Sequence, residues 1–111
     1  MVVFNDDSLL DKTVASRIKQ GYFKPDNSID LHGLNLMQAY DAVDDFLQSS
    51  IQNQARFLLI ITGVGGGGVL KQKIPHFILT KYAEKLLFIG NASFKQGGIG
   101  AVAVYLRKKS T

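Results

Sequence analysis

The chain has 111 residues, 46% of them hydrophobic, with 13 basic and nine acidic side chains and no cysteine. This length predicts one compact domain, no apolar run approaches the roughly 20 residues that cross a bilayer, and the missing cysteine excludes disulfides, thiolate metal sites and a cysteine nucleophile. Because Asn5, Asp6 and Asp7 stand where a secretion signal needs an apolar centre, we expect a cytoplasmic protein without membrane contact.

Charge is distributed unevenly along the chain. All eight aspartates lie at or before Asp45, where only four basic residues oppose them, and this part carries a net charge of −4. After Asp45, nine basic residues face Glu84 alone, which gives a net charge of +8. A basic half is typical of proteins that bind a polyanion such as DNA or RNA, although a solvated lysine surface explains the charge equally well.

The first predicted elements are a helix and a short strand. Apolar residues from Leu9 to Ile18 recur at helical spacing, which predicts an amphipathic helix over 8–20 that Gly21 ends. An irregular connection over 22–28 then leads to a short strand over 29–32.

The clearest predicted helix begins after Asn35. Asn35 and Gln38 have the spacing of a capping box, and Leu34 is placed to pack against Ala39. The helix carries an apolar stripe that runs to Ile51, whereas its other face takes polar residues. We place the carboxylates of this helix on that exposed face, namely Asp41, Asp44 and Asp45.

The remaining elements predict a layered α/β fold. A strand is predicted over 56–62, and its residues 57–61 are apolar on both faces, as in a central strand covered on two sides. We expect the first helix to form part of the second cover. A helix follows over 69–82, where Pro75 is tolerable only near a first turn or at a kink. The last strands cover 86–89 and 101–106, joined by a connection that holds Gly90, Gly97, Gly98 and Gly100.

This order predicts a βαβαββ mixed four-stranded sheet with two main helices, preceded by an N-terminal helix. Strands separated by helices imply right-handed parallel crossovers, and we expect the final pair to be antiparallel.

Asp30 and His32 are the first candidate for chemistry, because they lie where a strand ends and a helix begins. Period-two alternation puts both side chains on one face and Leu31 on the other. A carboxylate beside an imidazole orients the ring for proton transfer near neutral pH. From spacing alone, a histidine that caps the strand and an aspartate that binds loop amides are the more frequent arrangement.

The second candidate is the glycine loop Thr62–Gly68, which runs from a strand to a helix. Glycines bring backbone amides close to a phosphate, the helix N-terminus adds partial positive charge, and Lys71 and Lys73 follow at once. Val69 and Leu70 stand where a nucleoside-triphosphate loop needs Lys and Ser or Thr, which excludes that motif. A flexible turn is less favoured, because four consecutive glycines cost backbone entropy, and a small-nucleotide pocket is a further alternative.

The third candidate is the stretch Gly97–Gly100, just before the last strand. It is compatible with a simple hairpin or bulge. If both glycine loops lie at one end of the sheet, they form a backbone-lined groove flanked by Lys71 and Lys95. Such a groove follows a sugar-phosphate chain without reading its bases.

Together, the segments Ile29–Gly33, Thr62–Lys71 and Gly97–Ala101 resemble the small MutS-related (Smr) domain in order and spacing. The resemblance covers residues 29–107, which leaves an N-terminal helical extension over 1–28 and a basic tail over 108–111. It implies a sheet similar to that of a translation initiation factor domain, and nicking or endonucleolytic activity on DNA or RNA. It also implies that Asp30 and His32 are catalytic and that Gly63 and Gly65 contact nucleic acid.

One departure from the family concerns Thr62, where many members have histidine. Threonine does not exchange protons near pH 7, and the only other histidine, His76, reads as a surface or packing residue. A carboxylate cluster for a two-metal mechanism is also missing. We therefore predict no metal site, name no cofactor, and regard a divalent cation as compatible with the sequence.

The leading hypothesis is an endonuclease that cuts structured DNA or RNA, with a non-catalytic DNA- or RNA-binding module as the alternative. In the first, Asp30 orients His32, and loop amides with Lys71 stabilise charge on the phosphate. The partner is nucleic acid bound through its phosphate backbone, in a repair or ribosome-associated assembly. The expected nucleic-acid contacts are Thr62, Gly63, Gly65, Gly66, Lys71, Lys73, Lys95, Gly97, Gly98 and Gly100.

Overall fold

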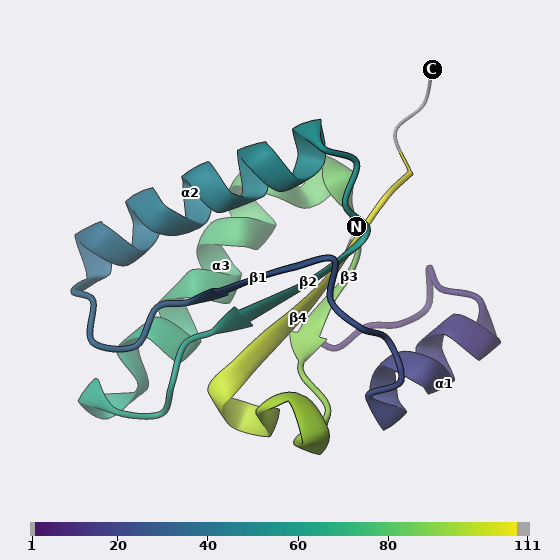
Figure 1. Ribbon diagram of the computed structural model, residues 1–111, viewed down its shortest axis with the longest axis horizontal. Coiled ribbons are helices and arrows are strands. Elements are labelled where there is room, and N and C mark those ends of the chain that lie inside the picture. The colour runs from purple at the N-terminus through teal and green to yellow at the C-terminus, as the bar shows by residue number, and fades with distance from the viewer. Residues whose placement is uncertain (1, 109–111) are drawn as a thin grey trace.

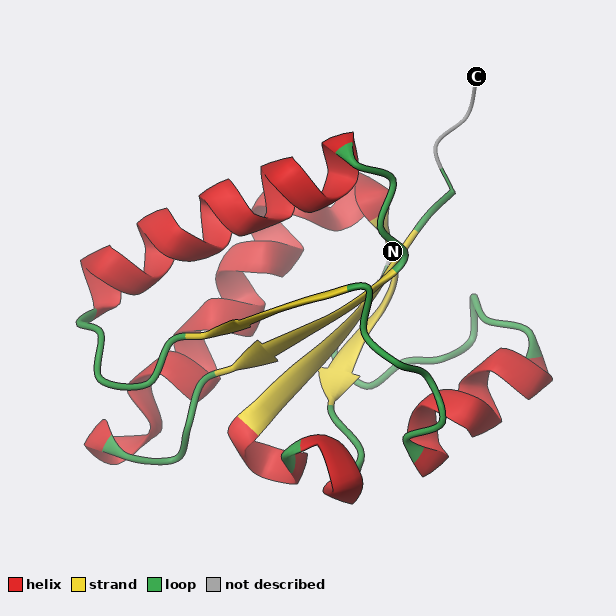
Figure 2. Ribbon diagram, in the orientation of Figure 1, coloured by secondary structure: helices red, strands yellow, loops and turns green. Residues whose placement is uncertain are grey.

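The computed structural model describes residues 2–108, in which a mixed sheet separates two main helices from a third (Figure 1, Figure 2). None of the described helices is both long and apolar enough to cross a membrane. The alternation confirms the predicted α/β class. In chain order the elements are α1 (Lys12–Gln20), β1 (Asn27–Asp30), α2 (Leu36–Gln52), β2 (Phe57–Ile61), α3 (Val69–Tyr82), β3 (Leu86–Asn91) and β4 (Ala101–Leu106).

The four strands lie in the order β1-β2-β4-β3. β1 and β2 are parallel, and β4 runs antiparallel to both of its neighbours, which confirms the antiparallel final pair. The insertion of β4 between β2 and β3 was not predicted, because the order of strands depends on long-range pairing. As a consequence, the carboxyl ends of the first three strands and the start of β4 meet at one end of the sheet.

One face of the sheet packs against α2 and α3 and forms the larger core. Val43 and Leu47 of α2 and Ile74 and Ile78 of α3 are fully buried there against the strands. Leu31, which follows β1, is fully buried in the same cluster. The apolar stripe of α2 is therefore the face that meets the sheet, as its spacing predicted.

The other face of the sheet packs against α1. Ile18 of α1 joins Phe57 and Leu59 of β2 and Ala101 and Ala103 of β4 in a second buried cluster. This confirms that the central strand is covered on both sides and that the N-terminal helix supplies part of the second cover (Figure 1).

The ends of the helices follow local chemistry. Asn35 accepts the Gln38 N–H at 2.8 Å, and the Gln38 side chain accepts the Asn35 N–H at 3.0 Å, which confirms the capping box. α1 begins at Lys12, later than predicted, because the Asp11 carboxylate accepts the Thr13 N–H and caps the helix there. Gly21 ends α1 in a left-handed conformation, as expected.

The bounds of three strands differ from prediction, and β2 is shorter by one residue at each end. β1 covers Asn27–Asp30, so His32 lies beyond its end, although the Leu31 N–H still donates to Ile61 at 2.7 Å. Gly90 belongs to β3, where it pairs with Ala103, and is not part of the connection between the last strands. A Cβ on Gly90 would lie 2.3 Å from Asn5 Oδ1, because the N-terminal segment packs closely on this strand.

The predicted environment of Asp44 was wrong, and Pro75 does not lie in a first turn. Asp44 does not lie on a free face, because it forms an ion pair with Lys81 Nζ at 2.8 Å and accepts the Tyr82 hydroxyl of α3. Burial and this hydrogen bond raise the pKa of Tyr82 to about 12. Pro75 lies buried in the middle of α3, which continues through it. The change at Asp44 arises because α3 packs against α2 and brings Lys81 and Tyr82 to it.

Asp26 links the start of β2 to the chain that precedes β1. Its Oδ2 accepts the N–H groups of Arg56 and Phe57 at 2.8 and 2.9 Å, and these bonds, chiefly that of Phe57, hold the pKa of Asp26 below its usual range. A depressed pKa gives stability that is complete above the unfolded value near 3.8 and is lost as the pH falls through the folded value.

We therefore expect Asp26→Asn to lower the urea midpoint near pH 7, where only the wild type holds an ionised acceptor. The difference from wild type should shrink as both proteins are titrated below about pH 3. Asp41→Asn, at an exposed position of α2, is the matched control. A difference that stays constant over this pH range would contradict the assignment.

Candidate active site

The three sequence motifs meet at one end of the sheet. The N–H groups of Thr62 and Gly63 both donate to the Gly100 carbonyl, at 3.0 and 2.9 Å, so the two glycine loops lie together as expected. His32 follows β1, which is parallel to β2, and a Cβ on Gly63 would lie 3.5 Å from the His32 Cβ. The parallel pairing of β1 and β2 therefore brings His32 beside the glycine loop.

Asp30 and His32 form a direct pair. His32 Nδ1 lies 2.7 Å from Asp30 Oδ1, and the same oxygen accepts the His32 backbone N–H at 3.0 Å. These two bonds, with the backbone bond the larger cause, hold the pKa of Asp30 below its usual range. Side-chain exposure is 75% for His32 and 48% for Asp30. With Nδ1 facing an ionised carboxylate, Nε2 is the nitrogen that remains free to exchange a proton.

A cleft of about 690 Å³ opens beside this pair. Its walls come from the segment that starts α2, from the end of β2 and from the segment that starts α3. Leu34, Leu36, Val69 and Leu70 give it an apolar lining next to His32. The N-termini of two helices thus border one cleft, and such ends favour negative charge.

The glycine loop turns sharply before α3. Gly66, Gly67 and Gly68 have φ values of 60°, 70° and 75°, a left-handed run that explains why glycines occupy these positions. Gly68 has no side chain, and no side chain caps the start of α3. Within residues 2–108, the N–H groups of Val64 and Gly65 donate to no other backbone group.

A family model for the Smr domain matches residues 29–107. The chain belongs to the Smr domain family. Among curated proteins, this Smr domain protein is similar to the ribosome rescue factor SmrB of Shewanella sp. (strain ANA-3). The two are 26% identical over 100 residues, which cover 90% of the chain and 55% of that relative. The chain therefore spans about half the length of the curated relatives it matches.

Two solved structures share the Smr fold. The Smr domain of Thermus thermophilus MutS2 has a TM-score of 0.66 at 27% identity, covering 73% of this chain and 98% of that domain. YdaL, a stand-alone small MutS-related protein from Escherichia coli, has a TM-score of 0.74 at 24% identity, covering 89% of this chain and 78% of YdaL. The family suggested by the three motifs is therefore confirmed.

Thr62 of this Smr domain points inward. It is 4% exposed, and its hydroxyl lies 3.2 Å from the Gly63 carbonyl and 3.4 Å from that of Gly100. This burial removes Thr62 from the surface open to nucleic acid, and the Gly63 N–H is occupied by Gly100. The loop amides that can reach a phosphate are therefore those of Val64 to Gly66.

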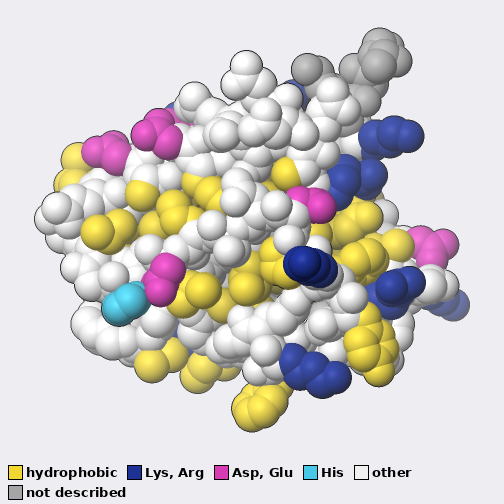
Figure 3. Space-filling model, viewed as in Figure 1, with side chains coloured by type: hydrophobic (Ala, Val, Ile, Leu, Met, Phe, Trp, Pro, Cys, Tyr) yellow, Lys and Arg dark blue, Asp and Glu magenta, His cyan; other side chains and the backbone are white. Residues whose placement is uncertain are grey.

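None of the three lysines expected beside the site is part of the described lining of the cleft. Lys71 is half-buried and Lys73 exposed on α3, and the described lining of the cleft includes neither. Lys95 Nζ lies 5.1 Å above the ring of Tyr22 instead. Figure 3 shows most of the basic side chains of this face over its right-hand half. The expected groove flanked by Lys71 and Lys95 is therefore not the cleft that the structure forms.

Sequence reasoning missed the apolar residues of the cleft. Leu34 and Leu36 flank the helix cap at Asn35, and Val69 and Leu70 begin α3, so they were read only as helix starts. The signal that could have found them is the closeness of the Asn35 cap to His32. His76 is exposed on α3 and is not part of the described lining. Among residues 2–108, no three His, Asp or Glu side chains are grouped to hold a metal.

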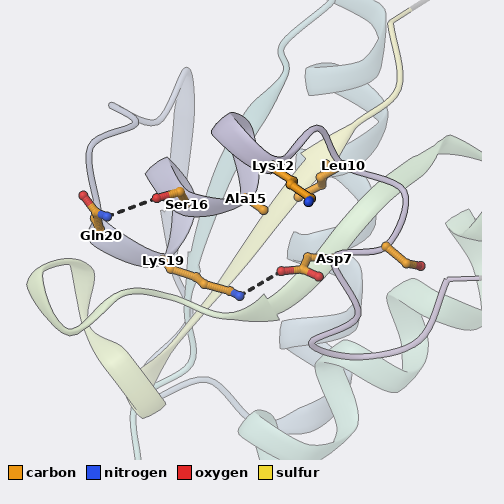
Figure 4. A pocket seen from close by; sticks show the side chains of 8 residues that line it. Asp7, Leu10, Lys12, Ala15, Ser16, Lys19 and Gln20 are labelled. Atoms are coloured by element: carbon orange, nitrogen blue, oxygen red, sulfur yellow. Dashed lines mark hydrogen bonds and ion pairs between the residues drawn. The ribbon is translucent and has the colours of Figure 1, made fainter.

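Two other cavities of the protein have no histidine in their lining. A cavity of about 480 Å³ lies on the N-terminal extension, where Lys19 is paired with Asp7 at 2.9 Å and Gln20 with Ser16 (Figure 4). A cleft of about 440 Å³ at the opposite end of the sheet from His32 is lined by Arg56, Lys85, Arg107 and Lys108. Neither is lined by a histidine, so of these three only the first cleft has the Asp30–His32 pair beside it.

The conformation of the glycine loop can be tested at Gly65 and Gly67, where an added Cβ would meet no other atom within 4 Å. We expect Gly67→Ala to cost roughly 1–2 kcal/mol of stability, because its φ of 70° is unfavourable for a residue with a Cβ. Gly65→Ala is the matched control, since its φ is −77° and no atom lies within 4 Å of its added Cβ. Equal thermal stabilities for the two variants would show that the left-handed turn does not exist.

Proposed function

We propose that this Smr domain binds nucleic acid through its phosphate backbone and cuts a phosphodiester bond at the His32 cleft. The observation that carries the proposal is the 2.7 Å contact between His32 Nδ1 and Asp30, at a cleft bordered by two helix N-termini. A phosphate in the cleft would meet the free N–H groups of the glycine loop on one side and the imidazole on the other.

In this proposal Asp30 is a positioning residue and His32 exchanges the proton. On RNA, His32 Nε2 removes the proton of a 2′-hydroxyl, and the oxygen attacks the adjacent phosphorus while the bond to the 5′-oxygen breaks. The products are a 2′,3′-cyclic phosphate and a 5′-oxygen that takes a proton from the imidazolium or from water. The N–H groups of Val64 and Gly65 stabilise the charge that develops on the phosphoryl oxygens. On DNA, His32 would activate a water molecule instead.

We propose a ribosome-associated setting for this activity. The support is the name of the Shewanella relative, ribosome rescue factor, together with the match along 90% of the present chain. The net charge of +8 after Asp45 is compatible with binding to a surface rich in RNA phosphates. The DNA-repair setting has no comparable support among these relatives.

The second candidate is an Smr domain that binds nucleic acid without cutting it. The observation in its favour is Thr62, which is buried and leaves His32 as the one histidine at the cleft among the described residues. This candidate requires affinity that falls steeply as salt is raised, because lysines and arginines displace counterions from the phosphates.

The test follows cutting by purified protein of labelled supercoiled plasmid and of structured RNA, with and without chelator. Cutting of either substrate supports the nuclease, and the chelator lane reports any need for a divalent cation. Binding of both substrates without cutting supports the second candidate. Parallel sedimentation with ribosomes tests the proposed setting, and a protein that stays out of the ribosome fractions at low salt would contradict it.

A further inference from the structure

Two exposed aromatic side chains lie on segments that contact each other, outside the His32 cleft. Phe94 is 96% exposed and Tyr22 is 61% exposed. Such exposure is unfavourable, because burying an aromatic ring away from water lowers the free energy. Lys95 Nζ lies 5.1 Å from the centre of the Tyr22 ring. We propose that Tyr22, Phe94 and Lys95 form a stacking site for unpaired bases of the nucleic acid that the cleft binds. This inference rests on the proposed function.

Tertiary contacts position these side chains from opposite ends of the chain. Gly21 approaches the turn after β3 so closely that a Cβ there would lie 2.4 Å from Ser93 Oγ. The Gln96 side chain also donates to the Phe23 carbonyl at 2.7 Å. The segment that holds Tyr22 is thus fixed against the turn Phe94–Gln96. Because these segments are already ordered, the stacking site loses less conformational entropy when a base binds to it.

The charge around the aromatics favours nucleic acid as the occupant. Residues 17–24 and 92–100 together contain four basic residues and no acidic one, and of the four Lys19 is paired with Asp7. Arg17 lies over the ring of Phe23 at 5.2 Å, as Lys95 does over Tyr22. Exposed rings set among cations are what proteins use to bind single strands, because each base offers a face for stacking and each nucleotide a phosphate. Figure 3 shows apolar and basic side chains together at this lower edge, over the turns before β4.

The stacking site is connected to the His32 cleft through the turns before β4. The turn that carries Phe94 leads into the turn Gly98–Gly100, and the Gly100 carbonyl accepts the Gly63 N–H of the glycine loop. Two exposed apolar side chains belong to these two loops, Ile99 at 61% and Val64 at 62% exposure, and Val64 also lines the cleft. A nucleic-acid strand with a phosphate in the His32 cleft can therefore place its neighbouring bases on the stacking site. A duplex keeps its bases paired and cannot stack them there, so the site selects unpaired strands.

The experiment measures binding of labelled single-stranded RNA and DNA by fluorescence anisotropy, with a duplex of equal length for comparison. All proteins carry His32→Ala, which prevents cutting. We expect Phe94→Ala to weaken single-strand binding about 5- to 150-fold and to leave duplex binding unchanged. Phe94→Tyr should restore it, because the ring is retained. A 2-aminopurine base in the strand should lose fluorescence on binding to the Phe94 protein but not to the Phe94→Ala protein.

Charge and stacking can be separated in the same assay. Phe94→Ala should leave the slope of affinity against salt unchanged, whereas Lys95→Ala should reduce it by roughly 0.7, the value for one lost contact to a single-stranded phosphate. Leu9→Ala is the matched control, since this side chain is 47% exposed on the N-terminal extension and belongs to neither site. It should bind as the parent protein does.

Several outcomes would overturn the stacking site. Unchanged single-strand affinity in both Phe94→Ala and Tyr22→Ala contradicts it while leaving the proposed function intact. An equal loss of affinity for single strand and duplex, or no recovery of affinity in Phe94→Tyr, would show that the substitution disturbs the fold and not base stacking. Loss of ribosome binding with unchanged oligonucleotide affinity identifies a protein-docking surface instead. If the parent protein binds no nucleic acid of any kind, the proposed function itself fails, and the stacking site with it.

Discussion

His32→Ala is expected to lower the rate of nucleic-acid cutting by a factor of about 100 to 10,000, the usual contribution of a general acid or base. His32 Nε2 is the free nitrogen of an imidazole that Asp30 holds at 2.7 Å, and no other histidine contributes to the described lining of the cleft. Alanine removes the proton acceptor and leaves the loop amides in place. The rate should therefore fall while substrate affinity changes little, which single-turnover kinetics with excess protein will separate.

Two further variants make this result specific. His76→Ala should cut at the wild-type rate, because His76 is exposed on α3 and is not part of that lining. Asp30→Asn should reduce the rate less than His32→Ala, because an amide oxygen still accepts a hydrogen bond from Nδ1 but lacks the charge that stabilises an imidazolium. Cutting by His32→Ala at the wild-type rate would remove His32 from the mechanism and would point to a contaminating nuclease.

Leu31→Ala is expected to lower the free energy of unfolding by about 2–5 kcal/mol, the range for truncating a leucine in a packed core. Leu31 lies between the two proposed functional residues, and its side chain is fully buried among those of α2, α3 and the strands. Its truncation leaves a cavity under the end of β1 that the surrounding strands cannot fill. Urea denaturation monitored by circular dichroism will measure the loss.

Leu9→Ala is the matched control for this truncation. The same atoms are removed from a side chain that is 47% exposed, and we expect a change within about 0.5 kcal/mol. A loss below about 1 kcal/mol for Leu31→Ala would show that Leu31 is not in the core. The alternation that directs Asp30 and His32 outward would then be wrong as well, because one strand direction sets all three side chains.

The sequence alone determined the features that depend on near neighbours. The apolar stripe and the Asn35–Gln38 capping box predicted α2 to its first residue, because a helix start is decided by side chains three or four positions apart. The consecutive apolar residues of β2 predicted a strand that is covered on both faces of the sheet. The pairing of Asp30 with His32 was also accessible, since strand alternation places residues two apart on one side.

Only the tertiary structure decided the features that depend on distant segments. The insertion of β4 beside β2 follows from pairing energies between strands 40 residues apart in sequence, and no local period reports them. Contacts between distant segments also direct Thr62 inward onto Gly100, pair Asp44 of α2 with Lys81 of α3, and place Lys95 over the ring of Tyr22. Each of these side chains is polar in sequence terms, and its surroundings are set by whichever segment the folded sheet places next to it.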